Sequence, residues 1–274
     1  MKKLKAVFQN KVFLIGSLIV LFFLIMAIFP QWFSKIDPNE QNAQAMLQAP
    51  SAEHWFGTDN YGRDVFSRTV NGARIDLSIG IFAMLIPLIV GTVIGLIAGY
   101  FGGVVDLIIM RIVDIVMTFP FMVLVIAIVA ILGPGINNLY IAIWIVGWKE
   151  YARLIRSEVM VAKNMEYVQA GKTLGYSNFR IIMKHILSNV ISSAIVYAAS
   201  DIVMCMIAGA GVSYLGLGVQ APTPEWGSMM AAGKSFITSA WWMTVCPGAV
   251  MAFAGLGFSL FGDGISDLIR AKNR

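Results

Sequence analysis

The sequence is poor in charged residues. Asp, Glu, Lys and Arg make up 13% of its 274 residues, about half of the roughly 25% found in an ordinary soluble domain. Such a low share argues against a soluble enzyme and against a nucleic-acid-binding domain. The formal net charge of +5 is therefore interpreted as a sign of membrane orientation and not of an acidic partner.

Cysteine and histidine are scarce as well. Cys205 and Cys246 are the only cysteines, and both lie in apolar stretches outside any CxxC pair. His54 and His185 are the only histidines. Because a conventional nickel or zinc site needs several such ligands, the sequence predicts no metal site, and the methionines around Cys205 are interpreted as packing residues.

Catalytic motifs are also missing. The string closest to a phosphate-binding P-loop, residues 227–235, has five residues between its glycines, where the motif requires four. The HExxH and GxSxG motifs do not occur, which removes the commonest metalloprotease and hydrolase signatures. We therefore expect no catalysis in this chain, and no nucleotide or other cofactor bound to it.

Long apolar runs are what the sequence does have. Hydrophobic residues reach 58% and the mean hydropathy is +0.76. Because ~20 apolar residues in a helix cover a ~30 Å hydrocarbon core, we expect an all-α membrane protein with six transmembrane helices. They are predicted at residues 12–29, 77–100, 107–132, from about 137 onward, 190–212 and 240–261.

Three of these spans have further features. The second carries Gly91, Gly95 and Gly99, which favour close packing against another helix. The third contains Pro120. The fourth meets Lys149 after only about a dozen apolar residues, and it is kept as a span because a helix inside a bundle tolerates charge better than a lipid-facing one.

The distribution of Lys and Arg predicts the orientation. Six spans place both termini on one side, and the opposite side holds only five of the 20 basic residues, namely Lys35, Arg63, Arg68, Arg74 and Lys234. The positive-inside rule therefore places both termini in the cytoplasm. The expected organisation is a cytoplasmic tail (1–11), a first span (12–29), an extracytoplasmic loop (30–76), a transmembrane domain (77–262) with a cytoplasmic loop (153–189), and a cytoplasmic tail (263–274).

The cytoplasmic loop has its own helical pattern. Residues 158–174 are compatible with a helix, residues 175–178 break it, and apolar residues from Phe179 to Leu187 then recur at helical spacing. A loop of this length with periodic helices is longer than a connector needs. We favour a docking surface for a cytoplasmic partner over a solvated connector.

Asp201 is the one charged residue between Lys184 and Glu225. It lies about twelve residues into its span, roughly 18 Å at 1.5 Å per residue, and hence near the middle of the membrane. A carboxyl group at that depth faces a cavity or a polar partner. Two readings stay open: a residue of a translocation pathway, together with Met204, or a carboxyl group hydrogen-bonded to a neighbouring helix.

The outer loop has charges of alternating sign, with Asp59, Arg63, Asp64 and Arg68 among them. Charged runs are most often solvated faces. Two readings also stay open here, contact with an extracytoplasmic partner and a cap that braces itself through ion pairs.

Four segments together carry a family resemblance. Residues 166–175 (EYVQAGKTLG) with Arg180 and His185 resemble the coupling-helix motif of ABC-importer permeases. Residues 54–68, 102–114 and 213–227 agree with the same family, as does the Gly-Asp-Gly at 262–264. From residue 54 to 267 the chain is similar to the dipeptide, oligopeptide and nickel branch, and within it to second permeases of the nickel or metallophore type. It departs from the motif at Gln169, Ser188 and Ser266.

The resemblance implies a fold, partners and sites. The fold would be that of an ABC type I importer permease in a bacterial-type cytoplasmic membrane. A second homologous permease, two cytoplasmic ATP-binding subunits holding ATP and Mg²⁺, and an extracytoplasmic substrate-binding protein would complete the transporter. The residues it implies for coupling to the ATPase are Glu166, Tyr167, Ala170, Gly171, Leu174, Gly175, Arg180 and His185, and those for binding-protein contact are Asp59, Arg63, Asp64 and Arg68.

The substrate stays open at this stage. Nickel, a metal chelate and a short peptide are all compatible with the resemblance, and Asp201 tips the interpretation slightly toward a metal. A dipeptide- or oligopeptide-specific permease is the first alternative. An ion-driven secondary transporter and an intramembrane enzyme that uses Asp201 are lower alternatives, since neither further buried charges nor a second acid at membrane depth is evident.

Overall fold

The computed structural model describes residues 10–272 of the chain. Within that range the chain is helical, and its only β-type pairing is a single bridge between Thr58 and Asp64. Lys2, Lys3, Lys5 and Arg274, which contribute to the predicted orientation, lie outside the described residues.

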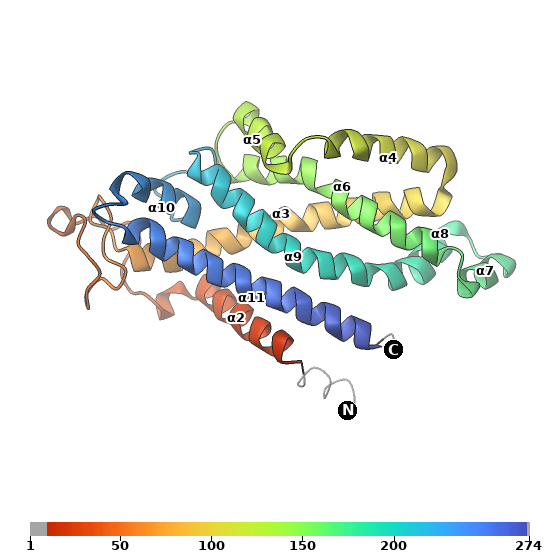
Figure 1. Ribbon diagram of the computed structural model, residues 1–274, viewed down its shortest axis with the longest axis horizontal. Coiled ribbons are helices and arrows are strands. Elements are labelled where there is room, and N and C mark those ends of the chain that lie inside the picture. The colour runs from red at the N-terminus through yellow and green to blue at the C-terminus, as the bar shows by residue number, and fades with distance from the viewer. Residues whose placement is uncertain (1–9, 273–274) are drawn as a thin grey trace.

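Five long helices run side by side along the length of the molecule (Figure 1). They are α2 (Lys11–Ile28), α3 (Val65–Phe101), α6 (Ile136–Ala162), α9 (Leu187–Tyr214) and α11 (Trp242–Lys272). At one end lie α7 (Glu166–Thr173) and α8 (Asn178–Arg180), and at the other end lie α10 (Trp226–Gly233) and the loop that joins α2 to α3. The remaining helices are α4 (Gly103–Met117), α5 (Phe121–Leu132), the short turns η1 (Pro30–Trp32), η2 (Ala43–Ala45) and η4 (Lys234–Phe236), and the π-helical turn η3 (Ile181–Ile186).

Four of the described helices are long and apolar enough to cross a membrane. They are α2, α3, the run from α8 through α9, and α11, and α4 with α5 make a fifth if the bent pair counts as one span. Helix α6 has 27 residues, but the charged residues in its second half keep it outside this group. The prediction of six spans, and the orientation derived from it, therefore stay predictions.

The expected third span, 107–132, is two helices and not one. Helices α4 and α5 meet at an angle of 84°, with Pro120 as the residue before α5. Proline has no N–H to donate and disfavours a helical conformation in the residue before it. The sequence contained this signal, but a run of apolar residues on both sides outweighed it in the prediction.

The cytoplasmic loop also divides differently from the prediction. Helix α6 continues to Ala162, and a short break precedes α7, so residues 158–174 are not one helix. After the predicted break at 175–178, α8, η3 and α9 form one continuous helical run that enters the membrane-spanning segment. The two ends of the loop are thus continuous with α6 and α9, and α7 is a separate short helix between them.

Small residues let α3 and α6 pack closely, as their pattern predicted. A Cβ atom on Gly91, Gly95 or Gly99 would collide with the backbone or Cβ atoms of α6. These three residues lie four apart and so form one stripe along α3. Buried residues of α3, α6 and α9 then form the larger of two hydrophobic cores, and α2, α10 and α11 with the outer part of α3 form the other.

Candidate functional site

Helix α7 presents a mixed polar and apolar surface at the end of the molecule (Figure 1). Its Val168 and Gly171 are buried, while Glu166, Tyr167 and Ala170 are exposed. Just beyond it, Leu174 is 70% exposed and Phe179 is 75% exposed. Large apolar side chains gathered at this level of exposure are typical of a surface that binds a protein.

A stack of side chains around Tyr176 packs against the buried side of α7. The ring of Tyr176 has the guanidinium carbon of Arg180 4.0 Å from its centre and the ring of His185 stacked at 5.8 Å. A Cβ atom on Gly171 would lie 3.4 Å from this tyrosine. Arg180, His185 and Gly171 thus hold the helix in place, and Gly175, at a φ of +74°, provides the turn that ends it.

Hydrogen bonds connect α7 and its flanking residues to α3. Gln169 Nε2 donates to the carbonyl of Lys163 at 3.0 Å, and Lys163 Nζ donates to the carbonyl of Gly99 at the end of α3, 2.8 Å away. Tyr100 of α3 donates through its hydroxyl to Asn178 at 2.7 Å. Helix α7 follows α6 after a three-residue break, and α8 leads through η3 into α9, so α7 is also connected along the chain to α6 and α9.

An ion pair fixes the cytoplasmic half of α6 to α4. Arg156 Nη2 donates to Asp106 Oδ2 at 2.6 Å, and its Nε contacts the other carboxylate oxygen. Arg153 pairs with Asp114, about two turns further along α4. These two pairs account for both arginines of α6, which are two of the charges that make it a poor span by composition.

Asp201 makes the hydrogen bond to a neighbouring helix that one of its two readings predicted. Its Oδ2 accepts a hydrogen bond of 2.8 Å from the hydroxyl of Tyr151 on α6, and Tyr197 lies edge-on against Tyr151 at 4.9 Å. The side chain of Asp201 is only partly buried. The residue is therefore bonded to a neighbouring helix and also borders open space.

A polar face extends along α9 from Asp201 toward the cytoplasmic end. It lines a groove of about 610 Å³ between α6, α9 and α11, to which α6 contributes Glu158 and α11 contributes Ser266. Glu158 accepts a hydrogen bond from Ser193 at 3.0 Å. The α9 residues in the groove are Asn189, Ser192, Ser193, Val196, Tyr197 and Ser200. In the other direction, Met204 is 57% exposed.

The polar face of α9 was not predicted from the sequence. Hydroxyl groups recur on α9 at 193, 197 and 200, close to the helical repeat. Each hydroxyl alone is unremarkable in an apolar helix, because it can bond to a carbonyl of the preceding turn. Their alignment with Asp201 was the available signal.

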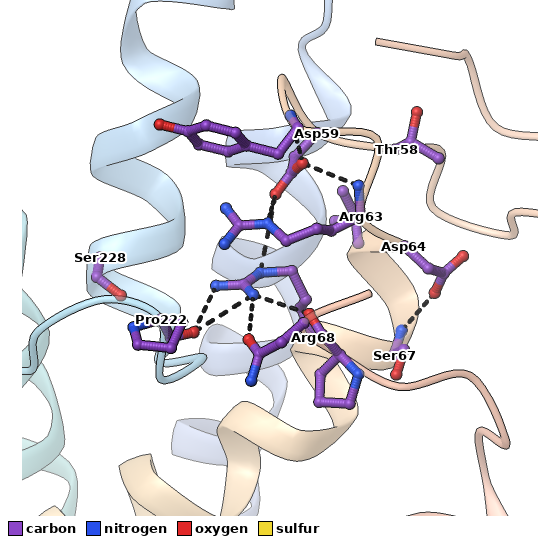
Figure 2. A network of polar contacts seen from close by, with 12 residues as sticks. Thr58, Asp59, Arg63, Asp64, Ser67, Arg68, Pro222 and Ser228 are labelled. Carbon is purple, nitrogen blue, oxygen red and sulfur yellow. Dashed lines mark hydrogen bonds and ion pairs between the residues drawn. The ribbon is translucent and has the colours of Figure 1, made fainter. Parts of the chain in front are cut away.

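The outer loop is held by charged side chains that are themselves buried. Asp59, Arg63, Asp64 and Arg68 are each between 3% and 9% exposed. Asp59 accepts hydrogen bonds from Arg63 Nε at 2.6 Å and from the backbone of Tyr61 at 2.8 Å (Figure 2). The reading as a self-braced cap thus fits the geometry of these residues well.

Arg68 and Asp64 connect this loop to its surroundings. Arg68 Nη1 donates to the carbonyl of Pro38 at 2.8 Å and to Asn39 Oδ1 at 3.0 Å, and it also reaches the carbonyl of Pro222 in the α9–α10 loop (Figure 2). Asp64 caps α3 by accepting from the backbone of Ser67. The two residues therefore fix three segments that are far apart in the sequence.

Glu225 and Trp226 anchor α10 against α3. Glu225 is fully buried and accepts hydrogen bonds from the backbone of Gly227 at 2.8 Å and Ser228 at 2.7 Å. Burial raises the pKa of its carboxyl group above the usual value. Trp226 donates its backbone N–H to Asp76 Oδ2 at 3.0 Å, so two buried acidic side chains of different elements meet at this point.

No metal centre is apparent within residues 10–272. No three His, Cys, Asp or Glu side chains of that range lie close enough together to hold an ion. What the described residues offer is an exposed mixed surface at α7, a polar face on α9, and an outer loop braced by buried charges.

The comparisons with known proteins match nearly the whole chain. A family model described as "Binding-protein-dependent transport system inner membrane component" matches residues 91–274, and one described as "N-terminal TM domain of oligopeptide transport permease C" matches residues 4–50. The chain is 45% identical to a dipeptide transport system permease protein of Alkalihalophilus pseudofirmus, over 96% of this chain and 87% of that protein.

Two further relatives show the same extent of similarity. The chain is 41% identical to a probable D,D-dipeptide transport system permease protein of Escherichia coli, over 94% of this chain and 86% of that protein. It is 38% identical to an oligopeptide transport system permease protein of Bacillus subtilis, over 97% of this chain and 87% of that protein.

Proposed function

Because the chain belongs to the family of inner membrane components of binding-protein-dependent transport systems, we propose that it forms half of a peptide pathway and that α7 couples this pathway to a cytoplasmic ATPase. As a permease subunit of an ABC importer it is a multi-pass protein of the bacterial cytoplasmic membrane and has no catalytic activity of its own. The family assignment confirms the resemblance found in the sequence.

The relatives support a peptide-like substrate. Those described above carry dipeptide, D,D-dipeptide and oligopeptide names, and another, 38% identical, is a glutathione transport system permease protein of Pectobacterium atrosepticum. The slight preference for nickel or a metal chelate, which depended on Asp201, has no support among them. We therefore take a short peptide as the substrate class.

The exposed surface of α7 is the observation that carries the coupling role. It combines a buried inner side at Val168 and Gly171 with exposed apolar side chains at Tyr167, Leu174 and Phe179. An amphipathic helix of this kind fits a hydrophobic groove on a partner. Glu166 and Ala170 belong to the outer surface and are proposed to contact the ATPase directly.

The connections of α7 provide the mechanism. ATP and Mg²⁺ bind to two partner subunits, and the closure of these subunits displaces the α7 of each permease. Because α7 is bonded through Lys163 and Asn178 to α3 and is joined in sequence to α6 and α9, the displacement tilts these helices as a rigid group. A second, homologous permease completes the pathway.

The polar face of α9 is proposed to line that pathway. Ser193, Tyr197, Ser200 and Asp201 place polar groups at membrane depth where this chain does not cover them fully. Such groups require water or a polar partner. The exposed Met204 continues this face toward the outer side.

The outer loop is proposed to receive the substrate-binding protein. Asp59, Arg63, Asp64 and Arg68 hold the loop, so their contribution to binding is to fix the position of exposed neighbours such as Trp55 and Tyr61, which are 64% and 52% exposed. This assigns the four residues a positioning role. Direct contact with the partner is left to the surface that they support.

Charge substitution on the α7 surface tests the coupling role. In a tagged permease purified from membranes that contain the whole transporter, Leu174→Asp and Phe179→Asp are expected to reduce the co-purified ATPase strongly. Gln44→Asp is the matched control, because Gln44 is an exposed residue of the loop that joins α2 to α3, and that loop lies at the end of the molecule opposite α7. Equal ATPase recovery with all three variants would contradict the proposal.

A further inference from the structure

A cavity of about 550 Å³ opens beside the outer charged network (Figure 2). It lies between the outer loop, the loop that precedes α10, α10 itself and the start of α11. A volume of this size is within the roughly 300–1,000 Å³ range of small-ligand sites. Among the residues that line it are Gln41, Asp59, Arg63, Arg68, Ser228 and Met243.

The cavity carries an excess of positive charge. Asp59 is the one acidic residue in its lining, and it is shared by two guanidinium groups, with Arg63 Nε at 2.6 Å and Arg68 Nε at 3.9 Å from the same oxygen. Both arginine side chains are at most 10% exposed. Two buried cations with one anion leave a charge of +1, which a bound anion would neutralise.

Arg63 is the arginine with donors to spare. Arg68 donates hydrogen bonds from its terminal nitrogens to Pro38, Asn39 and Pro222. Arg63 uses only its Nε, and among residues 10–272 nothing accepts a hydrogen bond from its two terminal nitrogens. Figure 2 shows these nitrogens directed toward the side of the site where Pro222 and Ser228 lie.

The surroundings of Arg63 favour a planar anion. The ring of Tyr61 lies 4.8 Å from the guanidinium carbon and restricts access to the face of that group. The edge of the guanidinium group that carries its two terminal nitrogens stays accessible, and two parallel N–H donors on such an edge match the two oxygens of a carboxylate. Lysine would offer only a point charge at this position.

We propose that this cavity binds the C-terminal carboxylate of a peptide on the extracytoplasmic side, with Arg63 as the group that holds it. The inference rests on the proposed peptide-transport function and adds a specificity-determining residue to it. Gln41 and Ser228 offer neutral polar groups to the peptide backbone, and Met229 and Met243 offer flexible apolar side chains. Such a lining recognises the chain terminus without selecting a particular side chain.

A comparison of a peptide acid with its amide tests this site. The probes are L-alanyl-L-phenylalanine and its C-terminal amide, titrated calorimetrically into the purified transporter complex in lipid nanodiscs without binding protein. The acid is expected to bind about tenfold or more tightly than the amide, since a lost charge-assisted bidentate pair exceeds 1.4 kcal/mol. Equal affinities for the two probes, or no binding of either, would overturn the proposal.

Variants identify the residue responsible. Arg63→Gln is expected to bring the ratio of acid to amide affinity close to one, and Arg63→Lys is expected to give an intermediate ratio. Lys234→Gln should keep the ratio, because Lys234 is an exposed cation outside the cavity lining. If Arg63→Gln does not assemble, the acid and amide titrations of the unmodified complex and of Arg63→Lys still decide.

The occupant has one serious rival, an acidic side chain of the binding protein. If Arg63→Gln keeps the acid-to-amide ratio but weakens association with the binding protein in surface plasmon resonance, the rival is correct and the peptide site is refuted. Measurement of ATP-driven dipeptide uptake distinguishes failure of this peptide site from failure of the proposed transport function. Uptake without any preference for the acid refutes this site alone, whereas absence of dipeptide uptake refutes the proposed function.

Discussion

Removal of the Tyr151 hydroxyl tests how α6 and α9 are joined at membrane depth. Tyr151 is fully buried and donates a 2.8 Å hydrogen bond to Asp201. A net contribution of about 0.5–3 kcal/mol is usual for such a bond, with the upper part for charged acceptors. Hydrogen bonds between transmembrane helices average only about 0.6 kcal/mol, so we predict that Tyr151→Phe lowers the unfolding free energy by about 1 kcal/mol.

The neighbouring tyrosine provides the matched control. Tyr197 packs edge-on against Tyr151, and its hydroxyl makes none of the hydrogen bonds found among the described residues. Tyr197→Phe should therefore change stability much less. For chains of about 150–250 residues, 1 kcal/mol corresponds to roughly 2–4 °C in Tm, so thermal unfolding of the purified complex resolves the expected difference.

A double substitution makes the test specific to the bond. If Tyr151 acts through Asp201, Tyr151→Phe should cost less in an Asp201→Leu background, which has no acceptor, than in the unmodified chain, because the interaction term appears only when both partners are present. Additive effects of the two substitutions, or equal losses for Tyr151→Phe and Tyr197→Phe, would refute the reasoning.

Three more predictions concern other parts of the molecule. Gly91→Ala should destabilise by about 1–3 kcal/mol, because its Cβ would collide with the backbone of α6, whereas Gly248→Ala, which meets only the flexible end of Met230, should cost less in the same thermal assay. Arg180→Ala removes the cation stacked 4.0 Å over Tyr176 and should cost about 0.5–1 kcal/mol, seen as faster proteolysis near α7; unchanged cleavage would count against the stack. Burial raises the pKa of Glu225, and stability should therefore fall as pH rises through that raised pKa. In unfolding curves recorded between pH 4 and 8, Glu225→Gln should flatten this dependence of stability on pH. An unchanged slope would show that Glu225 is not its source.

Apolar runs predicted most of the helices because membrane-spanning helices need ~20 such residues in sequence. That signal is local, and so it located α2 and α9 to within a few residues. Helix α3 begins at Val65, inside the predicted outer loop, and α11 continues to Lys272, through most of the predicted tail, because charged and polar residues extend both helices beyond their apolar runs. It did not resolve the bend at Pro120, where apolar residues continue on both sides of the break. It also did not show that the two ends of the cytoplasmic loop are continuous with α6 and α9.

Sequence reasoning found residues more readily than their partners. Asp201 was conspicuous as a lone charge, but its bond to Tyr151 joins positions 50 residues apart, and no local pattern predicts such a contact. For the outer charges the sequence left partner contact and a self-braced cap open, and it did not indicate that Arg68 is buried where it bridges the backbone carbonyls of Pro38 and Pro222. The free donors of Arg63 became apparent only once these bonds were assigned.

We propose above that this chain forms half of the membrane pathway of an ATP-driven peptide importer. The most direct measurement is uptake of radiolabelled dipeptide and of ⁶³Ni²⁺ into proteoliposomes that contain the assembled transporter with its binding protein. We predict dipeptide uptake that requires both ATP and the binding protein, and no comparable uptake of nickel. Dipeptide uptake without ATP, or uptake of nickel alone, would contradict the account.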